Sequence, residues 1–140
     1  MKATISTFTI EHYDQVFDLW KSCEGVGLSE ADSKDNIEKF LRHNKGLSLI
    51  AKQGKEIIGA LLVGHDGRRG YIHHLAVSPH LRRNGIGKGL VESGIERLKA
   101  IGIKKCHIFV FKNNESGKHF WEKCGCEYRE ELGIISKIIQ

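Results

Sequence analysis

The stretch that decides the fold lies in the middle of the chain and reads Leu75-Ala76-Val77-Ser78-Pro79-His80-Leu81-Arg82-Arg83-Asn84-Gly85-Ile86-Gly87-Lys88-Gly89. A strand-like segment ends near Ser78, a loop with two arginines follows, and glycines open a helix with apolar residues at helical spacing. The first N–H groups of a helix have no partner inside it and lie at the positive end of its dipole. Three glycines leave room there for a phosphate, and three cations add positive charge: Gly85, Gly87 and Gly89, with Arg82, Arg83 and Lys88. We interpret this helix start as a cradle for phosphate groups.

Two common phosphate-binding patterns do not fit this helix start. The dinucleotide fingerprint G-x-G-x-x-G would need a glycine where the chain has Leu90, and no stretch matches the P-loop pattern G-x-x-x-x-G-K-[ST]. A glycine-rich helix start with solvated arginines is the alternative without a ligand. It does not explain three glycines where each costs about 1 kcal/mol inside a helix. The spacing Arg82-x-x-Gly85-x-Gly87 resembles the coenzyme A signature of the GNAT N-acetyltransferase superfamily.

A second segment, residues 113–126, resembles the other motif of the same superfamily, an asparagine followed by a short helix. Four of its residues match that motif: Phe120, Glu122, Lys123 and Gly125. The family often has a tyrosine at the position of Trp121, where it is thought to protonate the departing thiolate, and an indole N–H is no usable acid. Protonation by water, protonation by Tyr128 and impaired catalysis remain open alternatives. The turn at residues 65–70 further suggests the YpeA-like branch.

The resemblance implies an α/β fold in which one central mixed sheet carries helices on both faces. This is the GNAT-like acyl-CoA N-acyltransferase fold, in a single domain covering residues 1–140. It also implies acetyl-CoA as the cosubstrate, no metal, and direct attack of a primary amine on the thioester, with a backbone N–H near Val77 as the oxyanion donor. A coenzyme A-binding module with weak or no catalysis is the alternative.

The resemblance assigns a set of residues to the cofactor. They are Leu75, Ala76, Val77, Arg82, Arg83, Asn84, Gly85, Ile86, Gly87, Lys88, Gly89, Asn113 and Trp121. For Asn113 a helix-capping role is the compatible alternative, because asparagine is a favoured cap. For Trp121 plain core packing on a helix is the alternative.

A base must take the proton of the attacking amine, and the strand before the glycine-rich loop offers two histidines. Strand alternation puts Tyr71, His73, Leu75 and Val77 on one face and the intervening residues, His74 included, on the other. Relatives with a side-chain base often place it at the positions of Tyr71 and His73, so the resemblance names these two as catalytic. His73 is preferred over His74, although a bulge near Leu75 would reverse the facing. A water chain acting as the base is the alternative.

Hydrophobic periodicity predicts the remaining elements. Strands are expected at residues 3–9, 47–52, 56–63, 71–78, 106–111, 126–130 and 133–139, and helices at residues 10–22, 33–43, 86–101 and 116–124. The segment 56–63 is apolar throughout and should be buried on both faces. The helix at 86–101 should connect two parallel strands as a right-handed crossover.

Composition and charge limit the partners. The 140 residues carry a net charge of +5, which attracts nucleic acid or a small polyanion. The cations cluster at one helix start, which favours a small polyanion, so we expect no nucleic-acid partner. No apolar run reaches the roughly 20 residues of a membrane span, and the first residues lack the apolar core of a secretory signal. We therefore expect a cytoplasmic protein without a membrane partner.

Two smaller features bear on the site. The spacing of the four cysteines, with only Cys124-x-Cys126 close together, does not fit a zinc site. The loop between the first two helices contains Glu24, Glu30 and Asp32, an acidic rim that would favour a cationic small-molecule or peptide amine. An ordinary solvated loop is the alternative, and the formation of a homodimer is left open.

Overall fold

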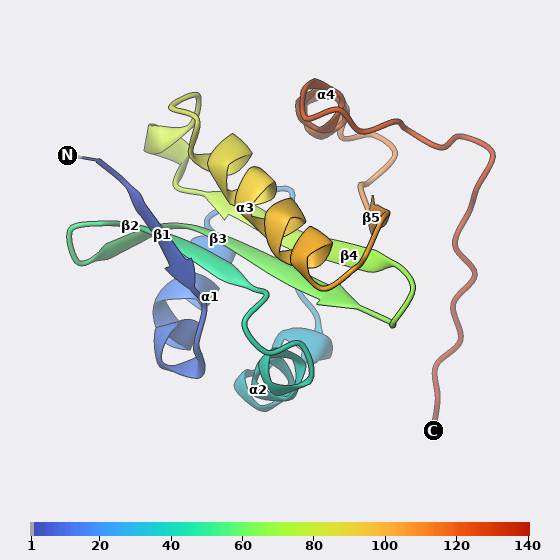
Figure 1. Cartoon of the computed structure of the whole chain (residues 1–140), viewed down its shortest axis with the longest axis horizontal. Helices are drawn as coiled ribbons and strands as arrows, with labels where there is room; N and C mark the ends of the chain where they lie inside the picture. The colour runs from blue at the N-terminus through green and yellow to red at the C-terminus, as the bar shows by residue number, and fades with distance from the viewer. Residues whose placement is uncertain (1) are drawn as a thin grey trace. The chain divides into compact units, whose positions relative to one another are not determined.

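A computed structural model of the chain describes residues 2–140. These residues form two compact units, which are described separately: one reaches to Phe109, and the other spans Val110–Gln140. The first unit contains the sheet and the helices α1, α2 and α3 (Figure 1). None of the helices in residues 2–140 has both the length and the apolar composition needed to cross a bilayer.

One five-stranded sheet with the order β1-β2-β3-β4-β5 is the framework of the first unit within the described residues. Its strands are β1 (Thr4–Thr7), β2 (Leu49–Gln53), β3 (Glu56–His65), β4 (Gly70–Val77) and β5 (Cys106–Ile108). The first four strands are antiparallel to their neighbours, and β5 lies parallel to β4. The predicted mixed sheet is therefore confirmed. The β2–β3 hairpin turns at Gly54 and Lys55.

Helices cover both faces of this sheet (Figure 1). One face carries α1 (Tyr13–Lys21), α2 (Lys34–His43) and the single-turn 3₁₀ segments η1 (Ile10–His12) and η2 (Glu30–Asp32). The main core cluster lies beneath them and joins apolar residues of α1 to β2, β3 and β4. Trp20 is its largest member and is 1% exposed. Helix α3 (Ile86–Ala100) packs on the opposite face.

The central strand β3 is buried along almost its whole length, as its apolar sequence predicts. Helix α3 approaches this strand closely at Gly59, where an added Cβ would lie 2.9 Å from Leu90 Cδ1 and 3.2 Å from Ile86 Cγ2. Ile86 is the first residue of α3. The absence of a side chain at Gly59 therefore allows the first turns of α3 to sit directly on the sheet.

A β-bulge interrupts β4 in its middle. Ala60 pairs with Ala76 and Leu62 pairs with His73, so the two residues His74 and Leu75 lie opposite one residue of β3. The backbone of His74 has a φ of 51°, which is uncommon for a residue with a side chain. The simple alternation expected for this strand is therefore wrong beyond His73, because the extra residue shifts the facing of everything that follows.

The second unit contains α4 (Glu115–Lys123), which agrees with the helix predicted at 116–124. The strands predicted at 126–130 and 133–139 are wrong, because neither segment is assigned to a strand in the structure. Apolar side chains there are more than half exposed, namely Leu132, Ile134, Ile135, Ile138 and Ile139. Branched apolar residues favour strands only where a neighbouring strand supplies hydrogen bonds and packing, and within residues 126–140 no such pairing is found.

Candidate active site at the end of strand β4

The start of α3 is open and has no side-chain cap among the described residues. Its N-cap is Gly85, which has a φ of 79° and receives no side-chain hydrogen bond. The first hydrogen bond of the helix runs from Gly89 N to Gly85 O at 3.0 Å. The N–H groups of Ile86, Gly87 and Lys88 precede that bond, and within residues 2–140 they have no acceptor. A Cβ at Gly85 would have no atom within 4 Å, so the space in front of these groups is open.

The loop before α3 turns through left-handed backbone at two places. Arg83 has a φ of 69°, two residues before Gly85. The side chain of Asn84 closes the loop by donating from Nδ2 to Leu81 O at 3.0 Å. Such turns line up N–H groups on a concave surface and are typical of anion sites. The loop begins with the 3₁₀ turn η3 (Pro79–Leu81).

Three cations surround this helix start, as the sequence indicates. Arg82 and Arg83 are both exposed. Arg82 bends back so that its Nε donates to Val77 O at 3.3 Å, which links the loop to the end of β4. Lys88 lies 3.9 Å from Glu92 one turn further along α3. The helix start, the two arginines and Lys88 form a positive region on a short piece of chain.

The adjoining edge of β4 has no partner strand over residues 73–77 in the described structure. Strand β5 pairs only with Gly70, Tyr71 and Ile72. Ser78 N donates to Ile58 O at 2.8 Å, so Ile58 and Ser78 form a hydrogen-bonded pair. Hydrogen-bonded and non-hydrogen-bonded pairs alternate along an antiparallel ladder. The Gly59–Val77 pair is therefore non-bonded, and the N–H and C=O of Val77 face the free edge. Ala76 faces the other way, toward Ala60, and is buried in the core.

His73 lies in an aromatic row on the face that carries α1 and α2. Its ring is 6.4 Å from the parallel ring of Tyr71, 6.0 Å from Phe109 and 6.1 Å from Phe40. Burial, followed by the neighbouring charge of His74, lowers the pKa of His73 below its ordinary value. No hydrogen bond of the His73 ring is found within residues 2–140. The ring contacts recorded for His73 are thus stacked and edge-on contacts with aromatic side chains.

His74 lies on the same face, because the bulge turns it toward α1. Its Nε2 is 2.8 Å from Asp32 Oδ1, and the side chains of His74 and Asp32 are 19% and 8% exposed. The ring of Trp20 lies against it at 5.1 Å. The sequence did not indicate this pair, and both the acidic rim and the solvated loop expected for this segment would leave Asp32 exposed. That placement is wrong, because Asp32 is buried, whereas Glu24 and Glu30 are exposed.

The second unit holds the other two predicted cofactor residues. The cap of α4 is Asn114, whose Oδ1 accepts from Gly117 N at 2.9 Å, so the alternative capping role falls to Asn114 and not to Asn113. Trp121 packs edge-on against Phe120 at 5.1 Å. Tyr128, suggested as a substitute acid, lies under Lys118 Nζ at 4.4 Å.

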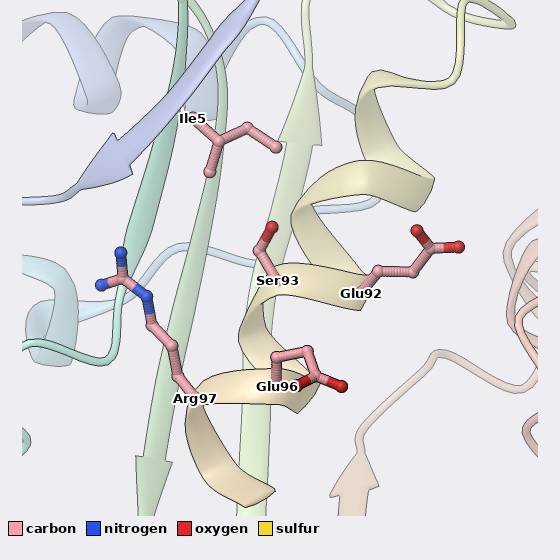
Figure 2. A pocket seen from close by; sticks show the side chains of 5 residues that line it. All are labelled: Ile5, Glu92, Ser93, Glu96 and Arg97. Atoms are coloured by element: carbon pink, nitrogen blue, oxygen red, sulfur yellow. The ribbon is translucent and has the colours of Figure 1, made fainter. Parts of the chain in front are cut away.

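A shallow depression between β1 and the outer side of α3 is a different feature (Figure 2). It has a volume of about 380 Å³ and is lined by Ile5, Glu92, Ser93, Glu96 and Arg97. Two of these residues are carboxylates, and Arg97 is engaged with Thr7 Oγ1 and Gly46 O. This depression therefore does not suit a polyanionic ligand.

Comparison with known proteins identifies the family. The sequence model of the Acetyltransferase (GNAT) family matches residues 13–126. The chain therefore belongs to the GNAT acetyltransferase family, as the helix-start motif indicated. The predicted mixed α/β fold of this family is confirmed with it.

Solved structures show the same fold at low sequence identity. PaiA N-acetyltransferase from Thermoplasma acidophilum, in complex with coenzyme A, has a TM-score of 0.77 at 21% identity, with 88% of each chain covered. Glucosamine-6-phosphate N-acetyltransferase from Arabidopsis thaliana has a TM-score of 0.72 at 19% identity, with 100% of each chain covered. AAC(6')-Iy, solved with the bisubstrate analogue CoA-S-monomethyl-acetylneamine, has a TM-score of 0.79 at 17% identity, covering 99% of this chain and 100% of that chain. At these identities the likeness concerns the fold, and the YpeA-like branch stays a prediction.

Proposed function

We propose that this protein transfers the acetyl group of acetyl-CoA to a primary amine of a small molecule or peptide. The observation that carries the proposal is the start of α3, where uncapped N–H groups, an open Gly85 and two exposed arginines lie next to the free edge of β4. This helix start offers a phosphate group both N–H donors and positive charge. Membership of the GNAT acetyltransferase family supports the same reaction class.

Two parts of the cofactor would use two parts of this region. The pyrophosphate would lie at the start of α3, against Arg82, Arg83, Asn84, Gly85, Ile86, Gly87, Lys88 and Gly89. The pantetheine amides would follow the β4 edge at Leu75 and Val77, where main-chain groups lack a partner strand in the described residues. Ala76 would contribute only through its neighbours, because its main chain faces β3. Asn113 and Trp121 stay predictions from the family resemblance.

The proposed chemistry needs one oxyanion donor and one base. The amine nitrogen attacks the thioester carbonyl, a C–N bond forms, and the C–S bond breaks to release the thiolate. The N–H of Val77 is the proposed donor to the carbonyl oxygen, since a donor fixed in advance stabilises developing charge most effectively. The amine proton must pass to a base. The sequence predicts His73 beside Tyr71 for this role, and the structure adds His74 as a second candidate.

A pair of glycine variants at the two ends of α3 tests the cofactor site. Gly85→Ala adds a methyl group where an approaching phosphate needs room, and we expect the Kd for coenzyme A to rise about tenfold, or about 1.4 kcal/mol. Gly102→Ala is the matched control. Gly102 also has a positive φ, of 87°, and open space around it, but it ends α3 by donating to Lys99 O. Each variant should lose about 1–2 kcal/mol of stability from left-handed strain.

Isothermal titration with coenzyme A and an assay for thiol release decide the outcome. Acetyl-CoA is offered with amino acids, polyamines, aminoglycosides and peptide N-termini. Thiol release with at least one amine, together with weakened binding in Gly85→Ala alone, supports the proposal. Equal losses of affinity in the two variants would remove the helix start as the site. Tight binding of coenzyme A without turnover on any amine would favour the non-catalytic module, the alternative that Trp121 in place of the family tyrosine suggests.

A further inference from the structure

The pair formed by His74 and Asp32 joins residues that are far apart in the sequence. Asp32 belongs to the short turn η2, and His74 lies at the bulge of β4. Their side chains meet at 2.8 Å, and both are largely removed from water. A hydrogen bond between a carboxylate and an imidazole in such surroundings is stronger and better oriented than one at the surface.

Asp32 is fixed from three directions. Its Oδ1 contacts His74, and its Oδ2 accepts from Ser29 N at 3.0 Å. The hydroxyl of Tyr13, in α1, donates to the main-chain oxygen of Asp32 at 2.6 Å. Neither oxygen of the carboxylate is left to rotate freely. Asp32 is therefore a rigid support for whatever it binds.

The carboxylate also sets the state of the imidazole ring. An ionised carboxylate only accepts hydrogen bonds, so the hydrogen of a neutral His74 must lie on Nε2. The lone pair then lies on Nδ1, and no hydrogen bond of that atom is found in residues 2–140. The ring is thus held with one nitrogen anchored and the other able to take a proton. This arrangement, a base oriented by a third group, recurs in enzymes that activate a nucleophile.

The backbone at His74 is in a sparsely populated conformation. Its φ of 51° belongs to the left-handed region, which is unfavourable for a residue with a side chain. Such strain persists only where surrounding contacts hold it, and it gathers at functional sites. Here the bulge, the Asp32 contact and the packing of Trp20 keep the backbone of His74 in this conformation.

The pair also lies beside the free edge of β4. His74 is three residues from Val77, whose N–H and C=O face that edge. The thiol of Cys23, two residues beyond the end of α1, lies 3.6 Å from Val77 O, so the chain that follows α1 reaches this part of the strand. Trp20 in the same helix has a buried indole N–H without a hydrogen-bond partner among the described residues.

We infer that His74, oriented by Asp32, is the group that accepts the amine proton in the acetyl transfer, an inference that rests on the proposed function. His74 is the catalytic residue, and Asp32 is a positioning residue that acts through it. His73 then serves as part of the aromatic wall formed with Tyr71 and Phe109. The distinction is geometric: both rings lie on the same face, and in the described structure only His74 has an orienting partner.

These groups account for the proton that the amine loses. As the amine nitrogen bonds to the carbonyl carbon and the C–S bond breaks, one proton moves from nitrogen to Nδ1 of His74. The imidazolium is then stabilised by the Asp32 carboxylate. The same proton passes to the departing thiolate or to water, which restores the neutral ring. A dedicated tyrosine acid at the position of Trp121 is not required by this scheme.

Four variants of the full chain test the assignment, with the amine that gives the highest thiol release. His74→Gln keeps the reach to Asp32 but cannot take a proton, and we expect kcat/KM to fall about 10²–10³-fold. The Kd for coenzyme A should stay within about twofold, because the phosphate site is untouched. His74→Asn tolerates the left-handed backbone better. It should recover any stability lost in His74→Gln without recovering activity.

Asp32→Asn and the matched variant His73→Gln separate positioning from packing. The charged and titratable groups around the His74 ring are Asp32 of η2, His73 of β4 and, through Asp32, the hydroxyl of Tyr13 in α1. Removing the Asp32 charge should lower kcat about tenfold and move the acid limb of the pH–rate profile to lower pH, because the imidazolium loses its counter-charge. His73→Gln should keep that limb.

The results separate the two proposals. Thiol release by the wild type with an unaltered pH–rate profile in His74→Gln would overturn the role of His74 and leave the proposed function intact. Loss of the acid limb in His73→Gln alone would move the role to His73. No thiol release by the wild type on any amine would overturn the proposed function, and the role of His74 with it.

Discussion

Two adjacent histidines of β4 illustrate how much depends on a single backbone residue. Simple alternation would put His73 and His74 on opposite faces, but the bulge brings both to the face that carries α1 and α2. Their surroundings then differ. His73 is stacked among aromatic rings, whereas His74 contacts the Asp32 carboxylate. The two side chains therefore have different packing partners, although they are adjacent in the sequence.

The stability of the fold should decrease as the pH falls from about 7 to 5. Burial lowers the pKa values of His73 and His12 in the folded state, so the unfolded chain binds more protons once the pH approaches the ordinary histidine value. This contribution to stability is present above that value and is lost as the pH falls through it. Urea unfolding across this range should show the decrease.

His73→Phe keeps the aromatic packing and removes the titration. Its free energy of unfolding should depend less on pH than that of the wild type between pH 7 and 5. Equal slopes for the two proteins would show that burial of His73 does not contribute.

At the scale of single residues, the sequence could indicate the glycines and arginines of the α3 start, because the helix dipole and the lack of side chains act locally. It could not indicate the contact between Asp32 and His74. That contact depends on a bulge and on the placement of a loop 42 residues away in sequence. Taken by itself, the sequence of that loop shows only that it is acidic, and does not show which residue Asp32 contacts.

At the scale of elements, the contact between β3 and α3 sets where the candidate phosphate site lies. A Cβ at Gly59 would lie too close to side chains of the first turns of α3. Gly59→Ala should therefore cost about 1–3 kcal/mol in the free energy of unfolding, since the core has little room to adjust. Chemical denaturation measures this loss.

Gly133→Ala is the control for that substitution, because a Cβ there meets no atom within 4 Å. It should change the stability by less than about 0.5 kcal/mol. Similar stabilities for Gly59→Ala and the wild type would mean that α3 can shift away from the sheet, and that its start is not fixed by this contact.

Most elements follow from local patterns, and the exceptions have a common cause. The strand–loop–helix unit from β4 to α3 and the helix α4 carry their own turn and cap residues, and these were predicted closely. The predicted fifth strand at 106–111 shortens to Cys106–Ile108, and the two strands expected after α4 do not form. A strand needs a neighbour, and the sequence of residues 126–140 does not say whether one is present.

At the scale of the whole molecule, the net charge of +5 favours anionic ligands, and the positions of the cations decide where such a ligand would bind. Arg82 and Arg83 are exposed at the open end of α3, while Arg97 is bound within the fold. We expect a polyanion to bind at the helix start, where these two arginines adjoin the uncapped N–H groups of α3. The attraction should weaken as salt is added, because exposed charges are screened over about 10 Å at 0.1 M ionic strength.

The most direct test is a titration of the ¹⁵N-labelled full chain with coenzyme A, followed through its backbone amide signals. We predict that the largest shifts belong to Val77 and to residues 85–88, because their N–H groups have no acceptor in the described residues. Gly102 at the far end of α3 should hardly move. Shifts centred on another surface, or none at millimolar coenzyme A, would contradict the claim that this helix start holds the cofactor.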